Sequence, residues 1–320
     1  MIRPFGLRDV LTIKQLQSQS VSFDLRRLLL CSSPPLRSAL VGYFSRYHWG
    51  AVTCVSDGRD GQPSGFCQVY PRENRPEWEL ARLAPSLDEC PGAGELWIKL
   101  LASLIVQGAE RGVLRIMARA TEDAEVEDLF RGAGFAVVAR KEVFVSTDRP
   151  SPAPRPRGLR RYVDQDRGAV EHLQRQVVPQ LAQRAQDVVR YGCSGASVGP
   201  LVPVSTEGYV WTEKQRLVGY LGITSSSRGS WIEVLVRPEY RADALPHIRY
   251  VLTRARRSGV RPIYCPVPDY IAGIGWLLRT LGFQSYTRQA IMVAQTLARV
   301  RSREQVVVPG LQGSVDVSAP

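Results

Sequence analysis

The sequence is poor in several residue types, and each shortage removes a class of protein from consideration. Its six cysteines include no CxxC pair and its three histidines are scattered, which argues against a metal site and a disulfide framework. No apolar run approaches the ~20 residues that a membrane helix needs, and the first residues lack the apolar core of a signal peptide. We therefore expect a cytoplasmic protein without a metal or a membrane segment, with buried and inert thiols.

Lysine is also scarce, because only four of the 42 basic residues are lysines. Residues 1–148 hold 18 basic and 18 acidic side chains, so the whole net charge of +12 falls after residue 148. The arginine bias alone can reflect coding composition, but the asymmetry suggests an anionic ligand or partner near the second half. Nucleic-acid binding is the less favoured form of this hypothesis, since no array of stacking aromatic residues accompanies the arginines of one predicted helix, Arg249, Arg254, Arg256 and Arg257.

The length of 320 residues suggests about two domains, and a linker is visible between them. The stretch DRPSPAPRPRG at residues 148–158 has a proline at every second position from 150 to 156, which favours an extended, semi-rigid spacer. We therefore predict an N-terminal domain over 1–148, a linker over 149–158, a C-terminal domain over 159–300 and a tail over 301–320.

The two predicted domains repeat one pattern. LFRGAGF at 129–135 returns as LLRTLGF at 277–283, and WELARLAP, from Trp78 to Pro85, returns as WIEVLVRP, from Trp231 to Pro238. Each copy reads β-α-(α)-β-β-β-α-β-α-β by hydrophobic periodicity, with a glycine, Gly134 or Gly282, capping the last helix. The repeat of the whole element order predicts duplication of a complete domain. Helical spacing marks the buried faces at Val10, Ile13 and Leu16; Val170, Leu173 and Val177; Trp97, Leu100, Leu101, Leu104 and Ile105; and Ile248, Val251, Leu252 and Ala255.

This order, with its V-x-P-like ending of the fourth strand and its leucine pair before G-F, resembles the GNAT superfamily of N-acetyltransferases. The resemblance covers both halves and implies an α/β fold with a mixed sheet, in two tandem GNAT-like acyl-CoA N-acyltransferase domains. It also implies acetyl-CoA as donor and co-substrate, a small-molecule or peptide amine as acceptor, and direct transfer between them. Two fused copies can be a monomer or a homodimer.

The donor loop of the family reads R/Q-x-x-G-x-G/A, and each copy keeps a part of it. In the first copy Leu83 opens the V-x-P equivalent, and the loop keeps the glycines as Gly92, Ala93 and Gly94, although two carboxylates, Asp88 and Glu89, stand where Arg or Gln is expected. In the second copy Arg241 is in register, but Ala244 and Pro246 replace the glycines. Because glycine lets the backbone approach a pyrophosphate closely, we predict donor binding in the first copy, with the second copy around Arg241 as the alternative.

The catalytic residues of the family are only partly present. Glu79 has the register of the family's glutamate base, six residues before Pro85, whereas Glu233 lies five before Pro238, so strand alternation predicts that they face opposite sides. A solvent-facing carboxylate is the competing interpretation of Glu79. The tyrosine acid of the family is replaced by Phe130 and Leu278, which cannot donate a proton, and Tyr270 and Asp269 near the same turn are possible substitutes.

Two functions follow from these residues. The first is an acyl-CoA-dependent N-acetyltransferase with one working copy, and the alternative is a catalytically degenerate GNAT-fold binding or scaffold protein. An aromatic cluster can line an acceptor pocket or belong to the core: Tyr43, Phe44, Tyr47, His48 and Trp49.

Overall fold

The computed structural model describes residues 2–31, 33–46, 49–58, 63–72, 76–148, 151–185, 204–255 and 262–296. The predicted tail lies outside the described residues, as do Tyr47, His48, Cys193, Arg256, Arg257 and the stretch 188–201 that corresponds to the first copy's aromatic cluster.

The second half follows the element order that the repeat predicts, and the first half adds one short strand between its first two helices. The first half contains β1 (Ile2–Pro4), η1 (Leu7–Asp9), α1 (Val10–Leu16), β2 (Val21–Ser22), α2 (Leu25–Cys31), α3 (Pro35–Phe44), β3 (Val52–Asp57), β4 (Ser64–Pro71), β5 (Glu77–Ala84), α4 (Ala93–Glu110), β6 (Arg115–Thr121), α5 (Ala124–Gly132) and β7 (Ala136–Ser146). The second contains β8 (Leu159–Arg161), η2 (Asp164–Asp166), α6 (Arg167–Val177), α7 (Gln180–Ala185), β9 (Ser205–Glu213), β10 (Arg216–Ser225), β11 (Ser230–Val236), η4 (Pro238–Tyr240), η5 (Ala242–Ala244), α8 (Leu245–Ala255), β12 (Ile263–Pro268), α9 (Ile274–Thr280) and β13 (Gln284–Gln295).

The predicted helix faces form the cores of the two halves. Leu100 of α4 and Val251 of α8 are fully buried, and most of the predicted stripes on α4, α6 and α8 is buried as well. On α1 only Ile13 is buried, and Val10 and Leu16 are partly buried against the same cluster. Gly134 and Gly282 end α5 and α9 at φ +92° and +82°, the left-handed conformation in which glycine carries no Cβ penalty. The sequence pattern therefore predicts the helices and their buried sides correctly.

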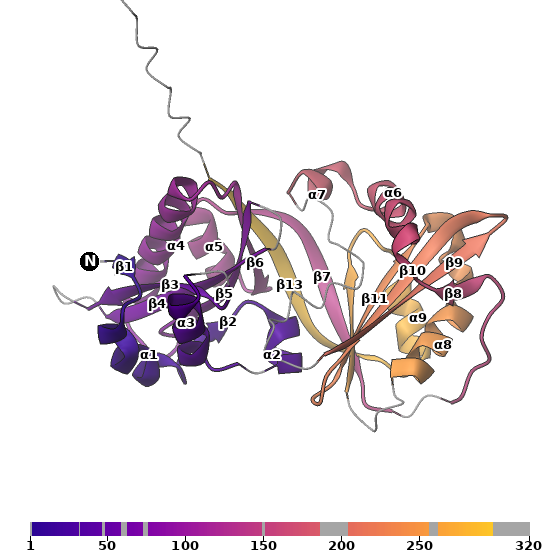
Figure 1. Cartoon of the computed structure of the whole chain (residues 1–320), viewed down its shortest axis with the longest axis horizontal. Coiled ribbons are helices and arrows are strands. Elements are labelled where there is room, and N and C mark those ends of the chain that lie inside the picture. Colours follow the sequence, from indigo (N-terminus) through magenta and orange to yellow (C-terminus); the bar gives the residue numbers. More distant parts are fainter. Residues whose placement is uncertain are drawn as a thin grey trace, which may run out of the picture.

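One continuous sheet joins the halves, because they exchange their last strands. The strand order is β1-β3-β4-β5-β6-β13-β7-β12-β11-β10-β9-β8, with β2 paired to β5 off this path. The second half's last strand, β13, pairs with β6 of the first half from Gln289 opposite Thr121 to Gln295 opposite Arg115. The first half's last strand, β7, pairs in turn with β12. Figure 1 shows β13 and β7 side by side where the halves meet.

The exchange carries side chains of each half into the core of the other. Ala290, Met292 and Ala294 of β13 are fully buried in the cluster around α4. Phe144 of β7 is buried in the cluster around α8. The division of the sequence at 1–148 and 159–300 stays a prediction about repeating units, and the sheet and both cores extend across it.

The entry to each half is built in the same way, by a feature that the sequence comparison missed. Two guanidinium nitrogens of Arg3 donate hydrogen bonds to the Asp9 carboxylate oxygens at 2.6 and 2.7 Å. In the second half, Arg160 donates to the Asp166 carboxylate in the same way, at 2.7 and 2.6 Å. Both carboxylates also accept a backbone N–H three residues earlier, at 2.9 and 3.0 Å, which fixes the 3-10 turn ahead of the helix. The signal in the sequence is an arginine six residues before an aspartate at the start of each copy.

Replacing Asp9 or Asp166 by asparagine is expected to lower the free energy of unfolding by about 1–2 kcal/mol near neutral pH, because a charge-assisted, bidentate contact is lost. The Arg160 hydrogen bond lowers the pKa of Asp166. Burial alone would raise the pKa of Asp9, but the hydrogen bonds from Arg3 and the Gly6 N–H, together with the charges of Arg3 and Arg8, hold it below its ordinary value. A carboxyl group with a depressed pKa stabilises the fold above its ordinary pKa and loses this effect as the pH falls through the folded value. Denaturant titrations should therefore show the wild-type advantage at pH 7 and its loss toward pH 3; equal stability at pH 7 would contradict the assignment.

Candidate functional site

Each half opens a gap in the sheet where two parallel strands diverge. β5 and β6 pair only from Glu77 opposite Arg115 to Glu79 opposite Met117. β11 and β12 pair at only two positions, Ser230 opposite Ile263 and Trp231 opposite Tyr264. Beyond these residues β5 and β11 each turn an edge away from their parallel neighbour, and backbone groups on such an edge need other partners.

In the first half the chain itself fills this gap. β2 pairs antiparallel with β5, Val21 opposite Leu83 and Ser22 opposite Arg82. The Phe23 N–H donates to the carbonyl of Ala81 at 2.8 Å. The Phe23 ring then packs between two aromatic side chains, with ring centroids 5.7 Å from Trp97 and 5.2 Å from Phe130.

The glycine loop of the first half has a clear structural use. Gly92 precedes α4 at φ +82°, a conformation that other residues rarely adopt, and a Cβ on Gly94 would lie 3.3 Å from the Leu129 side chain. Ala93 is buried, and the Leu83 side chain is fully buried beside β2. The donor role predicted for Leu83, Gly92, Ala93 and Gly94 stays a prediction, and turn geometry and helix packing account for these residues without a ligand.

In the second half no described segment pairs with the edge of β11 beyond Trp231. The residues that correspond to β2 lie between α6 and α7 and form no strand. Arg241 lies in the turn between β11 and α8, where its guanidinium donates to the carbonyls of Tyr270 at 3.2 Å and Ala272 at 3.3 Å. Arg241 thereby ties the turn after β11 to the turn after β12, and burial lowers its pKa.

A row of charged side chains crosses the sheet beneath α2 and joins the two gaps. Glu79 of β5 is ion-paired with Arg119 of β6, and its carboxylate lies 3.9 Å from Arg72. Glu233 of β11 binds Arg26 of α2 at 3.1 Å, and Arg26 also donates to the Thr224 hydroxyl at 2.6 Å. Burial lowers the pKa of Arg119 to about 10, with the neighbouring charge of Arg72 acting in the same direction.

The prediction that Glu79 and Glu233 face opposite sides is wrong. β5 carries one extra residue, Ala81, because Gln68 pairs with Arg82 whereas the next residue, Val69, pairs with Leu80. A bulge of one residue shifts the alternation by one, while β10 and β11 pair without a break. Six residues before Pro85 and five before Pro238 are therefore equivalent places, and both carboxylates belong to the row beneath α2.

Lys141 of β7 occupies the centre of this row. It is 9% exposed, its ammonium lies 5.9 Å from the Trp231 ring centroid, and it makes no hydrogen bond or ion pair with any described residue. Burial, aided by the charge of Arg119, holds the pKa of Lys141 well below its ordinary value. Asp24 closes the row from the start of α2; burial alone would raise its pKa, but Arg27 and Arg119 hold it below the ordinary value.

Comparison with solved structures decides the fold. A GCN5-related N-acetyltransferase from Sphaerobacter thermophilus matches 92% of this chain and 95% of its own, at 17% identity and a TM-score of 0.52. A tandem GNAT protein from the clavulanic acid biosynthesis pathway matches 92% and 98%, at 17% identity and 0.53. This chain has the tandem GNAT fold. A putative acetyltransferase from Pyrococcus horikoshii matches 92% and 89%, at 13% identity and 0.50. No protein-family model matches the sequence, and a search of curated proteins finds no match.

Several side chains that the sequence singled out lie elsewhere on the tandem GNAT fold. Tyr43, Phe44 and Trp49 are 39%, 71% and 64% exposed, so these members of the aromatic cluster are not core. Tyr270 is half-buried behind Arg241, and burial raises its pKa to about 12. Cys54, Cys67 and Cys265 are buried as predicted, whereas Cys31 and Cys90 are partly exposed.

The described part of the tandem GNAT fold contains no group of three or more acidic, histidine or cysteine side chains arranged for a metal. Among its helices, none combines the length and the apolar character needed to cross a membrane. Sequence reasoning missed the members of the charged row that come from α2, β6 and β7, because nothing in their local sequence indicates that these elements meet: Asp24, Arg26, Arg119 and Lys141.

Exchange of Lys141 for methionine is expected to stabilise the fold by about 1 kcal/mol or more at pH 7, since a buried ammonium without a paired carboxylate is replaced by an apolar chain of similar length. A lysine whose folded pKa is depressed lowers the stability of the fold at any pH below its unfolded pKa. This penalty falls as the pH rises through the folded value toward the unfolded value of about 10.5. The difference in denaturant midpoint between variant and wild type should therefore shrink between pH 7 and pH 10. Lys99→Met on the exposed side of α4 is the control, and a destabilising Lys141→Met would refute the penalty.

Proposed function

We propose that the protein is an acyl-CoA-dependent N-acyltransferase that uses acetyl-CoA and an amine acceptor, with the donor bound in the second half. The observation that carries this proposal is the contrast between the two gaps. β2 pairs with the edge of β5, whereas no described segment pairs with the edge of β11 beyond Trp231. This proposal differs from the prediction of a donor site in the first half, because we give the pairing of β2 with β5 more weight than the retained glycines.

The residues around the second gap suit an extended, amide-bearing donor with a phosphorylated end. A strand edge that no described segment pairs with has alternating N–H and C=O groups for a peptide-like chain, here along Val234–Val236, which are at most 4% exposed. The turn that follows contains η4 and η5 and leads into α8, whose first-turn N–H groups and positive dipole end favour phosphates. Pro246 lacks an N–H but stands in the first turn of α8, where that loss costs little. Arg241 supports this turn from behind through the Tyr270 and Ala272 carbonyls.

Acetyl-CoA would supply a thioester, and the chain's own groups would handle the proton of the attacking amine. Glu233 lies on β11 next to the open edge, and Arg26 and Thr224 hold it in place through the chain of contacts described above. We assign Glu233 as the group that accepts this proton. Glu79 is its equivalent in the first half, and each carboxylate is paired with an arginine, but there β2 covers the edge of β5. The acceptor is a small molecule or a peptide with a free amine.

Hydrogen–deuterium exchange with and without acetyl-CoA tests where the donor binds. We expect slower exchange in residues 232–245, where N–H groups would gain partners, and unchanged exchange in residues 79–95. Protection of residues 79–95 would place the donor in the first half, and no change anywhere would exclude acetyl-CoA as a ligand.

A matched pair of variants tests the chemistry. Glu233→Gln is expected to lower the acetylation rate by about 10²- to 10⁴-fold, the usual contribution of a general base, while acetyl-CoA binding persists. Glu79→Gln is expected to change the rate by less than a few-fold. The opposite order of effects would assign the base to the first half.

A binding or scaffold role without catalysis is the second candidate, and one observation favours it. Phe130 and Leu278, which stand where the family has its tyrosine acid, are both buried and apolar. Binding of acetyl-CoA without turnover over a panel of amines would support this role.

A further inference from the structure

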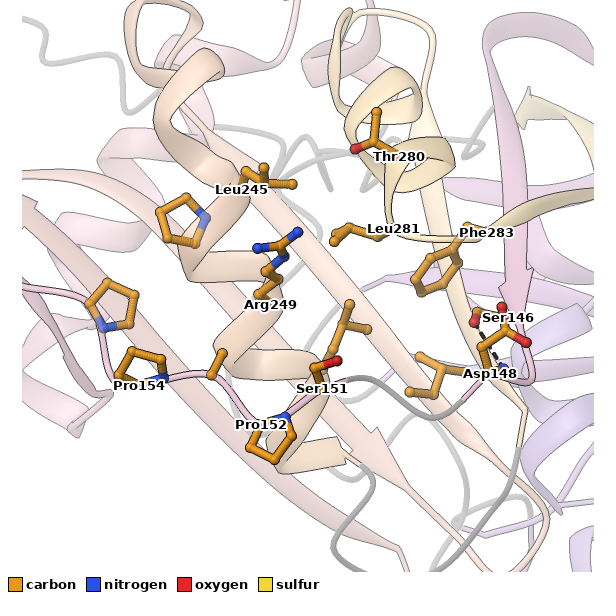
Figure 2. A pocket seen from close by; sticks show the side chains of 15 residues that line it. Ser146, Asp148, Ser151, Pro152, Pro154, Leu245, Arg249, Thr280, Leu281 and Phe283 are labelled. Carbon is orange, nitrogen blue, oxygen red and sulfur yellow. Dashed lines mark hydrogen bonds between the residues drawn. The ribbon is translucent and has the colours of Figure 1, made fainter.

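The proline-rich linker is one wall of a pocket. A cavity of about 640 Å³ lies between residues 151–156 of the linker, the length of α8, and the end of α9. In Figure 2, one side of the pocket is formed by Ser151, Pro152 and Pro154, and the other by Leu245, Leu281 and Phe283. None of the lining residues belongs to β11 or to the turn of η4 and η5, but the pocket shares the first turn of α8, Leu245 and Pro246, with the donor site proposed above.

The lining of the pocket is mostly apolar, with a few polar groups, which is the usual composition of a small-molecule site. The prolines, Leu245, Leu252 and Ile263 supply apolar surface, and Ser151 and Thr280 add hydroxyl groups. Because proline fixes φ, the linker forms its wall without losing further backbone freedom when a ligand binds.

Two side chains of opposite charge line this pocket, Arg249 and Asp148, and neither forms an ion pair with a described residue. Arg249 of α8 makes no hydrogen bond or ion pair with a described residue, whereas Arg254 on the same helix is bound to Tyr209 and Glu207. The Asp148 carboxylate likewise makes no hydrogen bond or ion pair with a described residue, although its backbone N–H donates to Ser146. In Figure 2 Arg249 and Asp148 lie on opposite sides of the pocket, with Leu281 and Phe283 between them.

We propose that this pocket binds an elongated zwitterion with an apolar body, with its carboxylate at Arg249 and its amine at Asp148. A guanidinium hydrogen-bonds a carboxylate through parallel N–H groups, and a carboxylate accepts from an ammonium. The apolar body would cover Leu252, Leu281 and Phe283. Either an ω-amino acid or a short apolar peptide with free ends has this chemistry, and each would bring the linker and the second half into one ligand-bound unit.

Isothermal titration calorimetry in the absence of acetyl-CoA tests this proposal, so its result does not depend on the proposed acyl transfer. The probes are 8-aminooctanoate, octanoate, octylamine, the tripeptide Ala-Leu-Ala and its N-acetylated amide. We expect 8-aminooctanoate or Ala-Leu-Ala to bind, and the better of the two identifies the ligand class. The probes that lack one or both charged ends should bind at least about tenfold more weakly, because each charged end contributes a charge-assisted hydrogen bond.

Charge-removing variants place the two ends of the ligand. Arg249→Gln should lower the affinity for octanoate and for the zwitterion by about tenfold or more, and Asp148→Asn should affect the zwitterion but not octanoate. Arg175→Gln, on the exposed side of α6, is the matched control and should leave all affinities unchanged. Ser151→Trp should abolish binding by filling the pocket from the linker. Absence of binding by every probe, or equal binding by wild type and Arg249→Gln, would overturn the proposal.

Discussion

Replacement of Met292 by alanine is expected to lower the free energy of unfolding by about 2–5 kcal/mol, the range for a truncated buried methionine in a core. Met292 belongs to the second half in sequence, but it is fully buried in the core of the first half, because β13 lies between β6 and β7. The loss should therefore appear in the first half, and the shared sheet should transmit it to the second.

Fluorescence in guanidinium chloride can follow the unfolding of each half, since Trp78 and Trp97 lie in the core of the first half and Trp211 in the core of the second. With the tryptophans of one core kept and the other tryptophans replaced, both sets of reporters should show the same lowered midpoint. Met292→Leu keeps the volume and should cost less than about 1.5 kcal/mol. A loss confined to the second half, or two separated transitions in the wild type, would contradict the exchange of strands.

Replacement of Phe23 by alanine is expected to cost about 3–5 kcal/mol. Phe23 is 2% exposed, its ring lies between Trp97 and Phe130, and its N–H is bonded to Ala81. Because β2 has only two residues, the packing of the Phe23 side chain that follows it is expected to be the main interaction that keeps β2 paired with β5. A short strand without this anchor should leave the gap open.

Phe44→Ala provides the matched control, because Phe44 is 71% exposed and its truncation should change the free energy by less than about 0.5 kcal/mol. Hydrogen–deuterium exchange of Phe23→Ala should show faster exchange at Val21–Phe23 and along Ala81–Leu83. Unchanged stability would mean that β2 is not part of the folded core. Acquired acetyl-CoA protection at residues 79–95 would show that β2 alone had kept the donor out of the first half.

The duplicated architecture could be predicted from the sequence because the signals for its helices and strands are local and occur in both copies. The helix stripes, the Trp-to-Pro strands and the capping glycines Gly134 and Gly282 are all set by near neighbours along the chain. The structure confirms each of them, and the solved tandem GNAT structures confirm the fold.

The candidate site was harder to predict because its decisive contacts are long-range. β2 has two residues and no period to detect, yet it decides which gap is filled. The bulge at Ala81 places Glu79 on the opposite face of the sheet from the one that regular alternation predicts. No residue type in WELARLAP indicates this bulge. β7 and β13 carry similar patterns, so periodicity cannot tell that each pairs with the opposite half.

The arrangement of the charged row has the same origin. Arg26 and Glu233 are separated by 207 positions in the chain and meet only after the sheet has closed. Asp123 illustrates the contrast, because it caps α5 through the Val126 N–H three residues away and its role follows from local sequence.

The position of β13 also determines when the first half can complete its sheet during synthesis. The edge of β6 is complete once Thr121 has been made, but its partner ends at Gln295, so the ribosome must add more than half of the chain before the two can pair. At about 5–20 residues per second this takes roughly 9–35 s, and during that time the nascent first half carries an unpaired strand edge beside an unfinished core. An unpaired edge is a template for pairing with other chains. Translation speed and chaperone contact over residues 122–295 should therefore influence the yield of folded protein more than changes in the first 121 residues.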